Sequence, residues 1–312
     1  MNFKFYPLRF EFTARQSLYF PPGKASNILR GALGVIFRSI ACVPECRQSV
    51  GGARTCEIRS SCPYAKIFEP ISGGVGPSGL ADSPRPFVFR ARHLDGRTIQ
   101  PNESFYFDLN LFSLEAETLA YFILTFAALA REGLGPNRGK AELQCVRRLI
   151  SEQLIYSSSK QMISSAVDPI TLSLEPTTPA PQQIRIDFLT PTELKYGQKI
   201  AERPEFPILF ARIRDRISTL RSLYGDGPIE MDYQASQSRA TQIKMTTCQM
   251  QREESGRRST RTGQVHSIGG FIGSAEYEGD LAEFLPWLEA ARYTGVGRQS
   301  VWGKGEIELT RL

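Results

Sequence analysis

Few side chains in this sequence can exchange a proton near neutral pH. Among 312 residues only His93 and His266 are histidines, and imidazole is the side chain whose charge changes in this range. His93 stands among three arginines, which favour its neutral, proton-accepting form. His266 follows an arginine-rich segment. Either histidine could act as a general base or acid, and either could equally be an ordinary surface or structural residue.

The early part of the chain offers polar groups of another kind. Residues 13–38 contain no histidine. They do contain a phenol, an ammonium and a guanidinium group, at Tyr19, Lys24 and Arg30. Such a set could align a reacting anion and stabilise its developing negative charge without a histidine. Arg30 has a simpler alternative as the surface arginine of a helix.

Four cysteines follow within a short segment. They are Cys42, Cys46, Cys56 and Cys62. Four thiolates in one loop could hold a structural zinc ion in tetrahedral geometry. Their spacing contains no close CxxC pair of the kind found in zinc ribbons, so unligated thiols are the alternative.

A pattern of helix, glycine-rich loop and strand occurs twice, at residues 120–143 and 281–309. In each copy an apolar helical run leads to Gly-x-Gly, a short basic loop, Gly-Lys and an alternating strand. The matching residues are Gly133, Gly135, Gly139, Lys140 and Glu142 in the first copy, and Gly295, Gly297, Gly303, Lys304 and Glu306 in the second. A repeat of this length indicates two copies of one α+β unit.

The glycine-rich loop of the second copy is a candidate binding site for a phosphodiester backbone. Glycine permits positive φ and close backbone approach, and Arg298 and Lys304 supply positive charge. The predicted contact residues are Gly295, Gly297, Arg298, Gly303, Lys304 and Gly305. A tight helix-to-strand connection without a ligand is the alternative, and it suits the first copy well.

A basic segment between two predicted strands is a second candidate contact with an anionic backbone. Its arginines are Arg252, Arg257, Arg258 and Arg261. Glu253 and Glu254 lie in the same segment, so a solvated hairpin tip is an equally good interpretation.

Hydrophobic periodicity predicts the same order of elements in both halves: strand, helix, strand, strand, helix, strand. In the first half these are residues 3–12, 27–40, 87–92, 104–112, 114–131 and 139–149. In the second half they are residues 184–188, 206–223, 243–250, 266–277, 281–291 and 305–309. This order predicts an α+β fold of two tandem ferredoxin-like (RRM-like) βαββαβ domains, whose exposed sheet face commonly binds RNA.

We place the domain boundary in a Ser-, Thr- and Pro-rich stretch. The N-terminal domain is then residues 1–180, with a cysteine-rich insertion at about 42–86, and the C-terminal domain is residues 181–312. The net charge of +6 is compatible with a nucleic-acid partner. The chain starts with an alternating pattern rather than a signal-peptide core, and its longest apolar run is too short to span a bilayer. We therefore expect a cytoplasmic protein whose cysteines are reduced.

Five motifs together resemble one family. They are LRGALG at 29–34, CPYAKIFEP at 62–70, FLTPTEL at 188–194, GGFIGSAEYEGDL at 269–281 and GVGRQSVWGKGEIEL at 295–309. In this order they resemble the CRISPR precursor-RNA processing endoribonucleases of the repeat-associated mysterious protein (RAMP) superfamily. The resemblance implies tandem ferredoxin-like domains and cleavage of repeat RNA without a catalytic metal or other cofactor. It also implies a product with a 2′,3′-cyclic phosphate, which is often retained and passed to an interference complex.

The chemistry implied by the resemblance uses the 2′-hydroxyl of the RNA as nucleophile. Many relatives place a histidine just after the first strand or in the first helix, where this chain has none. The remaining candidates for catalysis are Tyr19, Lys24, Arg30, His93 and His266. The alternative is a non-catalytic crRNA-binding subunit of a CRISPR effector complex, which the missing early histidine favours. An unrelated RNA-binding scaffold is a third reading.

Overall fold

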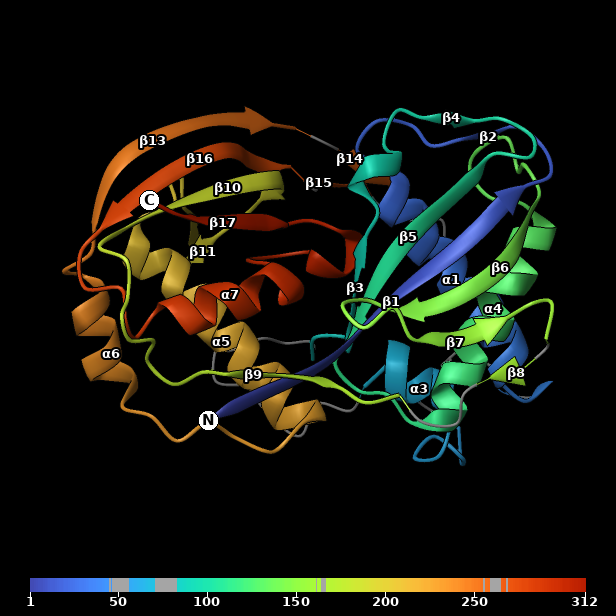
Figure 1. Cartoon of the computed structure of the whole chain (residues 1–312), viewed down its shortest axis with the longest axis horizontal. Coiled ribbons are helices and arrows are strands. Elements are labelled where there is room, and N and C mark those ends of the chain that lie inside the picture. The colour runs from blue at the N-terminus through green and yellow to red at the C-terminus, as the bar shows by residue number, and fades with distance from the viewer. Residues whose placement is uncertain are drawn as a thin grey trace. The chain divides into compact units, whose positions relative to one another are not determined.

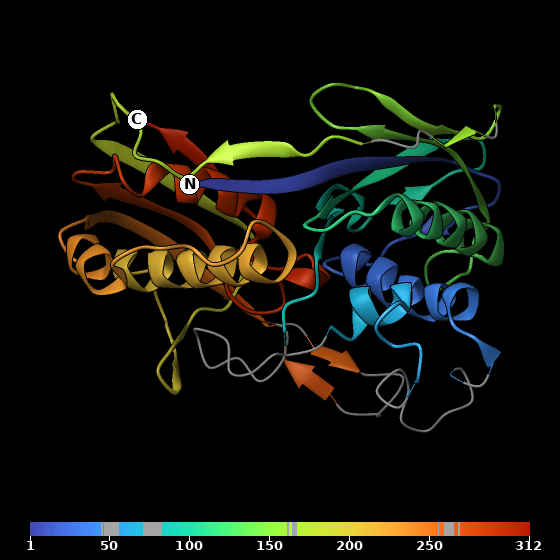
Figure 2. The ribbon, with the colours of Figure 1, turned by 90° about the horizontal axis from the view of Figure 1, so that it is seen from below.

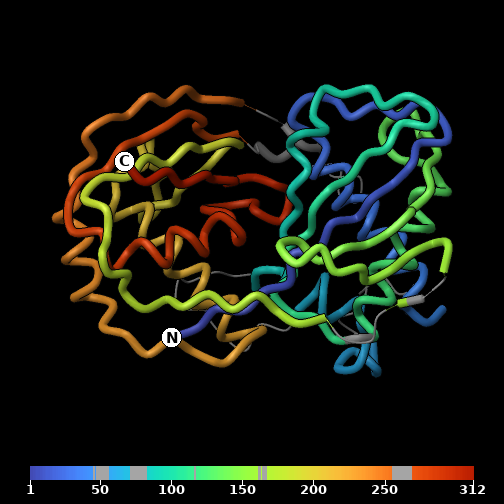
Figure 3. The backbone as a smooth tube through the Cα atoms, viewed as in Figure 1, coloured from blue at the N-terminus to red at the C-terminus, as the bar shows by residue number. Residues whose placement is uncertain are grey.

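The computed structural model describes residues 1–44, 46, 56–70, 83–160, 162–163, 167–254, 256–258, 265–267 and 269–312. Contacts divide the chain into two compact units. We call residues 5–170 the N-terminal unit, and residues 171–312 together with residues 1–4 the C-terminal unit. The division falls ten residues before the boundary placed at 180/181 from sequence. Both chain ends lie in the C-terminal unit (Figure 3), where Met1 O accepts a hydrogen bond from Leu174 N at 2.7 Å.

The N-terminal unit is built on a sheet with the order β3-β5-β1-β6, and every neighbouring pair is antiparallel. Two helices connect these strands, so the topology is the ferredoxin-like βαββαβ arrangement. The elements of this motif are β1 (Asn2–Ala14), α1 (Ala25–Ala41), β3 (Phe87–Arg90), β5 (Ser104–Leu111), α4 (Ala116–Glu132) and β6 (Ala141–Arg148). Figure 1 shows the strands, and Figure 2 shows the helices gathered on one face of the sheet.

Smaller elements extend this motif. Strands β7 and β8 continue the sheet beyond β6, and β2 pairs with β4. Strand β9, which begins at the last residue of this unit and continues into the C-terminal unit, pairs with β1. Their bounds, with those of α3 and the 3₁₀ helix η2, are β2 (Leu18–Tyr19), α3 (Pro63–Phe68), η2 (Arg92–Leu94), β4 (Thr98–Ile99), β7 (Leu154–Ser157), β8 (Met162–Ile163) and β9 (Ile170–Ser173).

Alternation along the strands builds the core of the N-terminal unit. Every second side chain of β1 faces the helices, so Phe10 stacks on Phe107 of β5 with ring centroids 5.5 Å apart. Phe126 of α4 reaches both rings, at 4.7 and 4.9 Å. Such aromatic contacts add to the burial of large apolar surface. The opposite side chains of β1, β5 and β6 form the face that is not covered by helices.

The C-terminal unit repeats the motif. Its sheet has the order β13-β16-β10-β17 with antiparallel neighbours, which confirms the predicted second ferredoxin-like domain. The motif consists of β10 (Gln183–Thr192), α5 (Phe206–Tyr224), β13 (Lys244–Glu253), β16 (Gly270–Glu278), α7 (Leu285–Thr294) and β17 (Ile307–Arg311). The further elements are β11 (Lys195–Tyr196), β12 (Lys199–Ile200), α6 (Tyr233–Ala240), β14 (Gly256–Arg258), β15 (Val265–Ser267) and the 3₁₀ helix η3 (Ser300–Trp302).

Two local features of the C-terminal unit differ from the sequence prediction. The strand predicted over 266–277 is divided into β15 and β16. Helix α6 was not predicted, because its sequence YQASQSRA has no apolar stripe. The helix is held instead by polar groups: Asp232 accepts hydrogen bonds from Gln234 N and Ala235 N, and the buried Arg214 donates to Gln237 Oε1 at 3.3 Å.

The two glycine-rich loops perform the same structural task in the two units. Gly135 and Gly297 have φ of 73° and 74°. A Cβ on Gly135 would lie 2.4 Å from Tyr19 O, and one on Gly297 would lie 2.3 Å from Glu193 O. Tyr19 and Glu193 each follow the first strand of their unit. A side chain at either glycine is therefore excluded by a neighbouring backbone.

Matching hydrogen bonds fix the correspondence of the two loops. Leu134 N donates to Gly139 O at 2.8 Å, and Val296 N donates to Gly305 O at 2.8 Å. Gly139 therefore corresponds to Gly305, and the sequence alignment of Gly139 with Gly303 was wrong. Three residues, 136–138, precede this glycine in the first loop, whereas seven residues, 298–304, precede it in the second. The second loop is longer than the connection requires.

We predict that Gly297→Ala lowers the free energy of unfolding by about 2–4 kcal/mol, because the new methyl group meets Glu193 O and the positive φ is retained. Gly31→Ala is the matched control. Gly31 lies in α1 with no atom within 4 Å of its added Cβ, so the change should stabilise the protein by about 0.5–1 kcal/mol. Urea unfolding measures both. Equal effects would contradict the proposed backbone contact.

Candidate functional site

The connection between β1 and α1 is fastened to the segment that carries His93. Tyr19 pairs with Thr98 across β2 and β4. Phe20 N donates to Arg97 O at 3.0 Å, and Gly96 N donates to Phe20 O at 2.8 Å. The structure therefore brings the segments of Tyr19 and His93 together, although 73 residues of sequence separate them.

The first turn of α1 joins the same group of segments. Lys24 occupies the N-cap position and makes no side-chain capping bond. Asp95, two residues after His93, supplies the cap because its Oδ1 accepts a hydrogen bond from Ala25 N at 2.8 Å. Arg30 is half-buried on the same helix, about 9 Å further along its axis. Lys24 thus lies beside the segment that carries His93, and Arg30 lies more than one turn beyond it.

His93 is exposed but held in one orientation. Its Nε2 lies 2.8 Å from Tyr106 O, and a carbonyl oxygen only accepts hydrogen bonds, so Nε2 carries the proton. In the neutral ring the acceptor is then Nδ1. The imidazole also stacks on the Tyr106 ring, with centroids 4.4 Å apart. This arrangement presents one ring nitrogen of His93 as a proton acceptor.

The uncovered sheet face of the N-terminal unit carries paired charges. Arg9 lies 3.8 Å from the centroid of the Tyr106 ring and donates two hydrogen bonds to Asp108, at 2.8 and 3.0 Å. These bonds raise the pKa of Arg9. Because Arg9 and His93 both stack on Tyr106, each must occupy its own face of the ring. Tyr106 is therefore unavailable for stacking on a base while both neighbours remain in place.

The longer glycine loop presents one of its two predicted cations to solvent. The Arg298 side chain is 55 % exposed, and its Nη1 lies 2.5 Å from Oε1 of Glu193. Lys304 is only 4 % exposed, although the sequence predicts that both residues contact a phosphodiester backbone. Ser300 Oγ donates to Gly297 O at 3.3 Å and ties the inserted turn to the loop. Arg298 is the cation of this loop that a ligand can reach.

The predicted basic segment lies partly outside the described residues. Arg252 is exposed at the end of β13. Arg257 and Arg258 lie in β14, where the backbone of Arg257 pairs with that of His266 in β15. The side chains of Arg257, Arg258 and His266 lie outside the described part of the structure, as does the whole of Arg261. The backbone thus places two arginines and His266 on one narrow hairpin.

The four cysteines predicted as metal ligands come together in the N-terminal unit. Cys42, Cys46 and Cys62 are buried, and Cys56 packs against them. Burial, followed by the neighbouring thiols of Cys62 and Cys46, raises the pKa of Cys42 to about 12. Burial also raises the pKa of Cys46. The buried cysteines pack against one another as small apolar groups.

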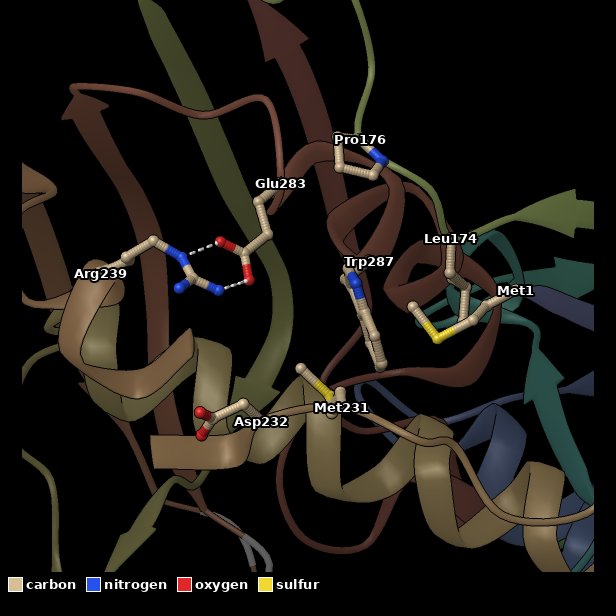
Figure 4. A pocket seen from close by; sticks show the side chains of 8 residues that line it. All are labelled: Met1, Leu174, Pro176, Met231, Asp232, Arg239, Glu283 and Trp287. Atoms are coloured by element: carbon tan, nitrogen blue, oxygen red, sulfur yellow. Dashed lines mark hydrogen bonds and ion pairs between the residues drawn. The ribbon is translucent and has the colours of Figure 1, made fainter. Parts of the chain in front are cut away.

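A pocket of about 270 Å³ in the C-terminal unit is a weaker candidate site (Figure 4). Its charged side chains already serve other partners. Arg239 donates to both carboxylate oxygens of Glu283, at 2.5 and 2.8 Å, which lowers the pKa of Glu283. Asp232 caps α6. Met1, Trp287 and other apolar residues form much of the remaining wall, so few polar groups are left to orient a ligand.

Family models match both halves of the chain. The model of the CRISPR-associated endoribonuclease Cas6 family matches residues 186–307. A second family model, AF_1859_N, described as an N-terminal domain, matches residues 3–168. No curated protein matches the chain. Among the described residues, no helix is both long and apolar enough to cross a membrane.

Solved Cas6 structures share this fold. A product complex of Thermus thermophilus Cas6 is similar with a TM-score of 0.56 and 15 % identity, over 98 % of this chain and 100 % of that chain. A second Cas6 product complex has a TM-score of 0.51 and 14 % identity, over 99 % and 100 %. A chain of a partial Cas6-RT-Cas1–Cas2 complex has a TM-score of 0.55 and 12 % identity, over 99 % of this chain and 46 % of that chain.

We predict that Asp95→Ala lowers the free energy of unfolding by about 1 kcal/mol, because α1 loses its capping acceptor. Asp226→Ala is the control. Asp226 forms an ion pair with Lys4 in which both side chains are 42 % exposed, so its loss should cost about 0–1 kcal/mol and fall with added salt. If Asp95→Ala shows the same salt-sensitive effect, the capping role assigned to Asp95 is wrong.

Proposed function

The chain belongs to the Cas6-type RAMP proteins of CRISPR systems, and we propose that it cleaves precursor CRISPR RNA within its repeats. The Cas6 endoribonuclease match over residues 186–307 carries this proposal. The two ferredoxin-like units support it, since both sheets have the strand order that the resemblance implied. The proposed partners are repeat RNA, mature crRNA and subunits of an interference complex, and the proposed location is the cytoplasm.

The proposed reaction is an internal transesterification that needs no protein nucleophile or catalytic metal. The 2′-oxygen attacks the adjacent phosphorus in line with the bond to the 5′-oxygen. A base takes the proton of the 2′-hydroxyl, the bond from phosphorus to the 5′-oxygen breaks, and an acid protonates the leaving oxygen. The products are a 2′,3′-cyclic phosphate and a free 5′-hydroxyl. The protein must align these atoms and stabilise the added negative charge on the phosphate.

We assign the catalytic groups to the N-terminal unit, where the segments of Tyr19, Lys24 and His93 are joined. His93 is the proposed base, since its Nε2 is engaged by Tyr106 O and its Nδ1 is the remaining acceptor. Lys24 is proposed to stabilise the phosphate charge. Tyr19 is an exposed residue, and its hydroxyl is proposed to orient the reacting group. Arg30 lies further along α1 and is proposed to contact RNA outside the cleaved bond.

RNA binding is proposed to use the longer glycine loop. Arg298 is exposed at its start. Seven residues lie between Gly297 and Gly305, against three between Gly135 and Gly139, so the second loop is four residues longer than the matching connection. Arg252 and the backbone-paired β14 and β15 are proposed as a second contact with the RNA backbone, with His266 among them. The competing function is a crRNA-binding subunit without nuclease activity, which the absence of histidine in residues 13–38 favours.

We predict that the protein cleaves labelled repeat RNA in EDTA and does not cleave RNA with a 2′-deoxy nucleotide at the cut. His93→Ala should slow single-turnover cleavage by about 10²–10⁴-fold through loss of the base, and Tyr19→Phe should slow it less. Tyr196→Phe is the control for Tyr19→Phe, because Tyr196 is exposed on β11. Mass spectrometry of the product end should find the cyclic phosphate.

The outcomes of this assay separate the two functions. Tight binding without cleavage of either RNA would establish the non-catalytic subunit. Cleavage that survives in both His93→Ala and Tyr19→Phe would move the catalytic site away from the assigned group, and His266→Ala would then be the next variant to measure.

We predict that Arg298→Ala weakens repeat-RNA binding about tenfold, since one charge-assisted contact is lost, and lowers the slope of log affinity against log salt by about 1. Arg311→Ala is the matched control, because Arg311 is also 55 % exposed and paired with a glutamate. Glu193→Gln should tighten binding by releasing Arg298. Equal effects of Arg298→Ala and Arg311→Ala would remove the loop from the interface.

A further inference from the structure

The four cysteines of residues 42–62 form a cluster of their own. Cys42, Cys46 and Cys62 are each 4 % exposed, and together with Ala65 they make a buried group against which Cys56 packs. Cys42 and Cys62 lie at opposite ends of the segment, yet both belong to this cluster. Residues that are far apart in this segment therefore meet in one buried group.

The buried members of this cluster are small side chains. Thiols form weak hydrogen bonds, the other buried member is an alanine, and the partly buried Tyr64 packs against the group. The nearby aromatic contact between Phe37 of α1 and Phe68 of α3, with centroids 5.4 Å apart, holds the two helices together. The cysteines lie just beyond it, where larger apolar side chains would serve a hydrophobic core better.

The donor set has a clear chemical preference. Four cysteine thiolates are a common ligand set for a structural zinc ion in tetrahedral coordination. None of the six cysteines forms a disulfide, so the four thiols are chemically available. Arg38 lies beside the cluster, where its Nη2 donates to Cys46 O at 2.8 Å. Its positive charge would offset part of the net negative charge of a zinc ion bound by four thiolates.

We propose that Cys42, Cys46, Cys56 and Cys62 bind one structural zinc ion. As the thiols stand, no three ligand-type side chains among the described residues are arranged to hold an ion. Because the four cysteines already lie in one cluster, rotation about their Cα–Cβ bonds is the movement we expect on binding. The ion would tie the end of α1, where Cys42 is the C-cap, to the start of α3, where Cys62 is the N-cap.

The site is separate from the proposed cleavage chemistry, which uses no metal. Its role would be to fix the segment that joins α1 to α3. Loss of zinc would therefore lower the thermal stability of the full chain without abolishing cleavage at a temperature where the protein remains folded. Activity in EDTA and zinc content are independent measurements, so failure of one proposal leaves the other standing.

We expect full-length protein purified under reducing conditions to contain about one zinc ion per chain by inductively coupled plasma mass spectrometry. Replacing zinc with Co²⁺ should give intense sulfur-to-cobalt charge-transfer bands and the visible bands of a tetrahedral thiolate site. Cys42→Ser and Cys62→Ser should each lower zinc affinity at least about tenfold in competition with a chromophoric chelator. Cys145→Ser and Cys248→Ser are the controls, since these cysteines lie in β6 and β13, and they should retain the zinc.

Several results would overturn the proposal. Zinc content below about 0.1 per chain, together with no tetrahedral thiolate spectrum when reduced protein is titrated with Co²⁺, would show that the cysteines do not bind metal. Full zinc content in the double variant Cys42→Ser/Cys62→Ser would place the ion elsewhere. If the serine variants fail to fold, the Co²⁺ titration of the unaltered protein still decides the question.

Discussion

The arrangement of the candidate site depends on a close approach of two backbones that occurs once in each unit. In the N-terminal unit, Gly135 lies against the carbonyl of Tyr19, and in the C-terminal unit Gly297 lies against the carbonyl of Glu193. Next to each glycine a backbone hydrogen bond closes the loop, from Leu134 N to Gly139 O in the N-terminal unit and from Val296 N to Gly305 O in the C-terminal unit. Because a Cβ cannot enter this space, glycine is a structural requirement in both loops, whether or not the loop also binds a ligand.

Shared architecture does not give the two loops the same chemistry. At matching positions the N-terminal unit carries Tyr19, with an exposed phenol, whereas the C-terminal unit carries Glu193, whose carboxylate holds Arg298. The first loop is short and serves the fold. The second has room for an inserted turn that exposes a guanidinium group. The same architecture therefore carries a proposed catalytic residue, Tyr19, in the N-terminal unit and a proposed RNA-binding residue, Arg298, in the C-terminal unit.

The basic composition overstates the free positive charge. Arg221 donates to backbone oxygens of Asn2 and Pro228, Arg216 donates to Thr294 O, and Arg85 donates to Phe68 O. These arginines bind carbonyl oxygens of β1, α3 and α7 and of one loop, and so fasten separate segments to one another. A guanidinium group has five donors in a rigid fork, which suits this role. The proposed affinity for RNA would therefore come from a few exposed cations rather than from net charge.

The sequence by itself determined the fold class, because alternation in strands and the 3.6-residue period in helices depend on local spacing. It also singled out the four cysteines and the glycine loops. It did not reveal α6, whose stability comes from polar contacts. Only the tertiary structure joined His93 to the loop of Tyr19, buried Lys304 and exposed Arg298, because these outcomes depend on contacts between distant residues. Spacing along the chain carries the periodicity of each element, but burial and pairing are set by what packs against it.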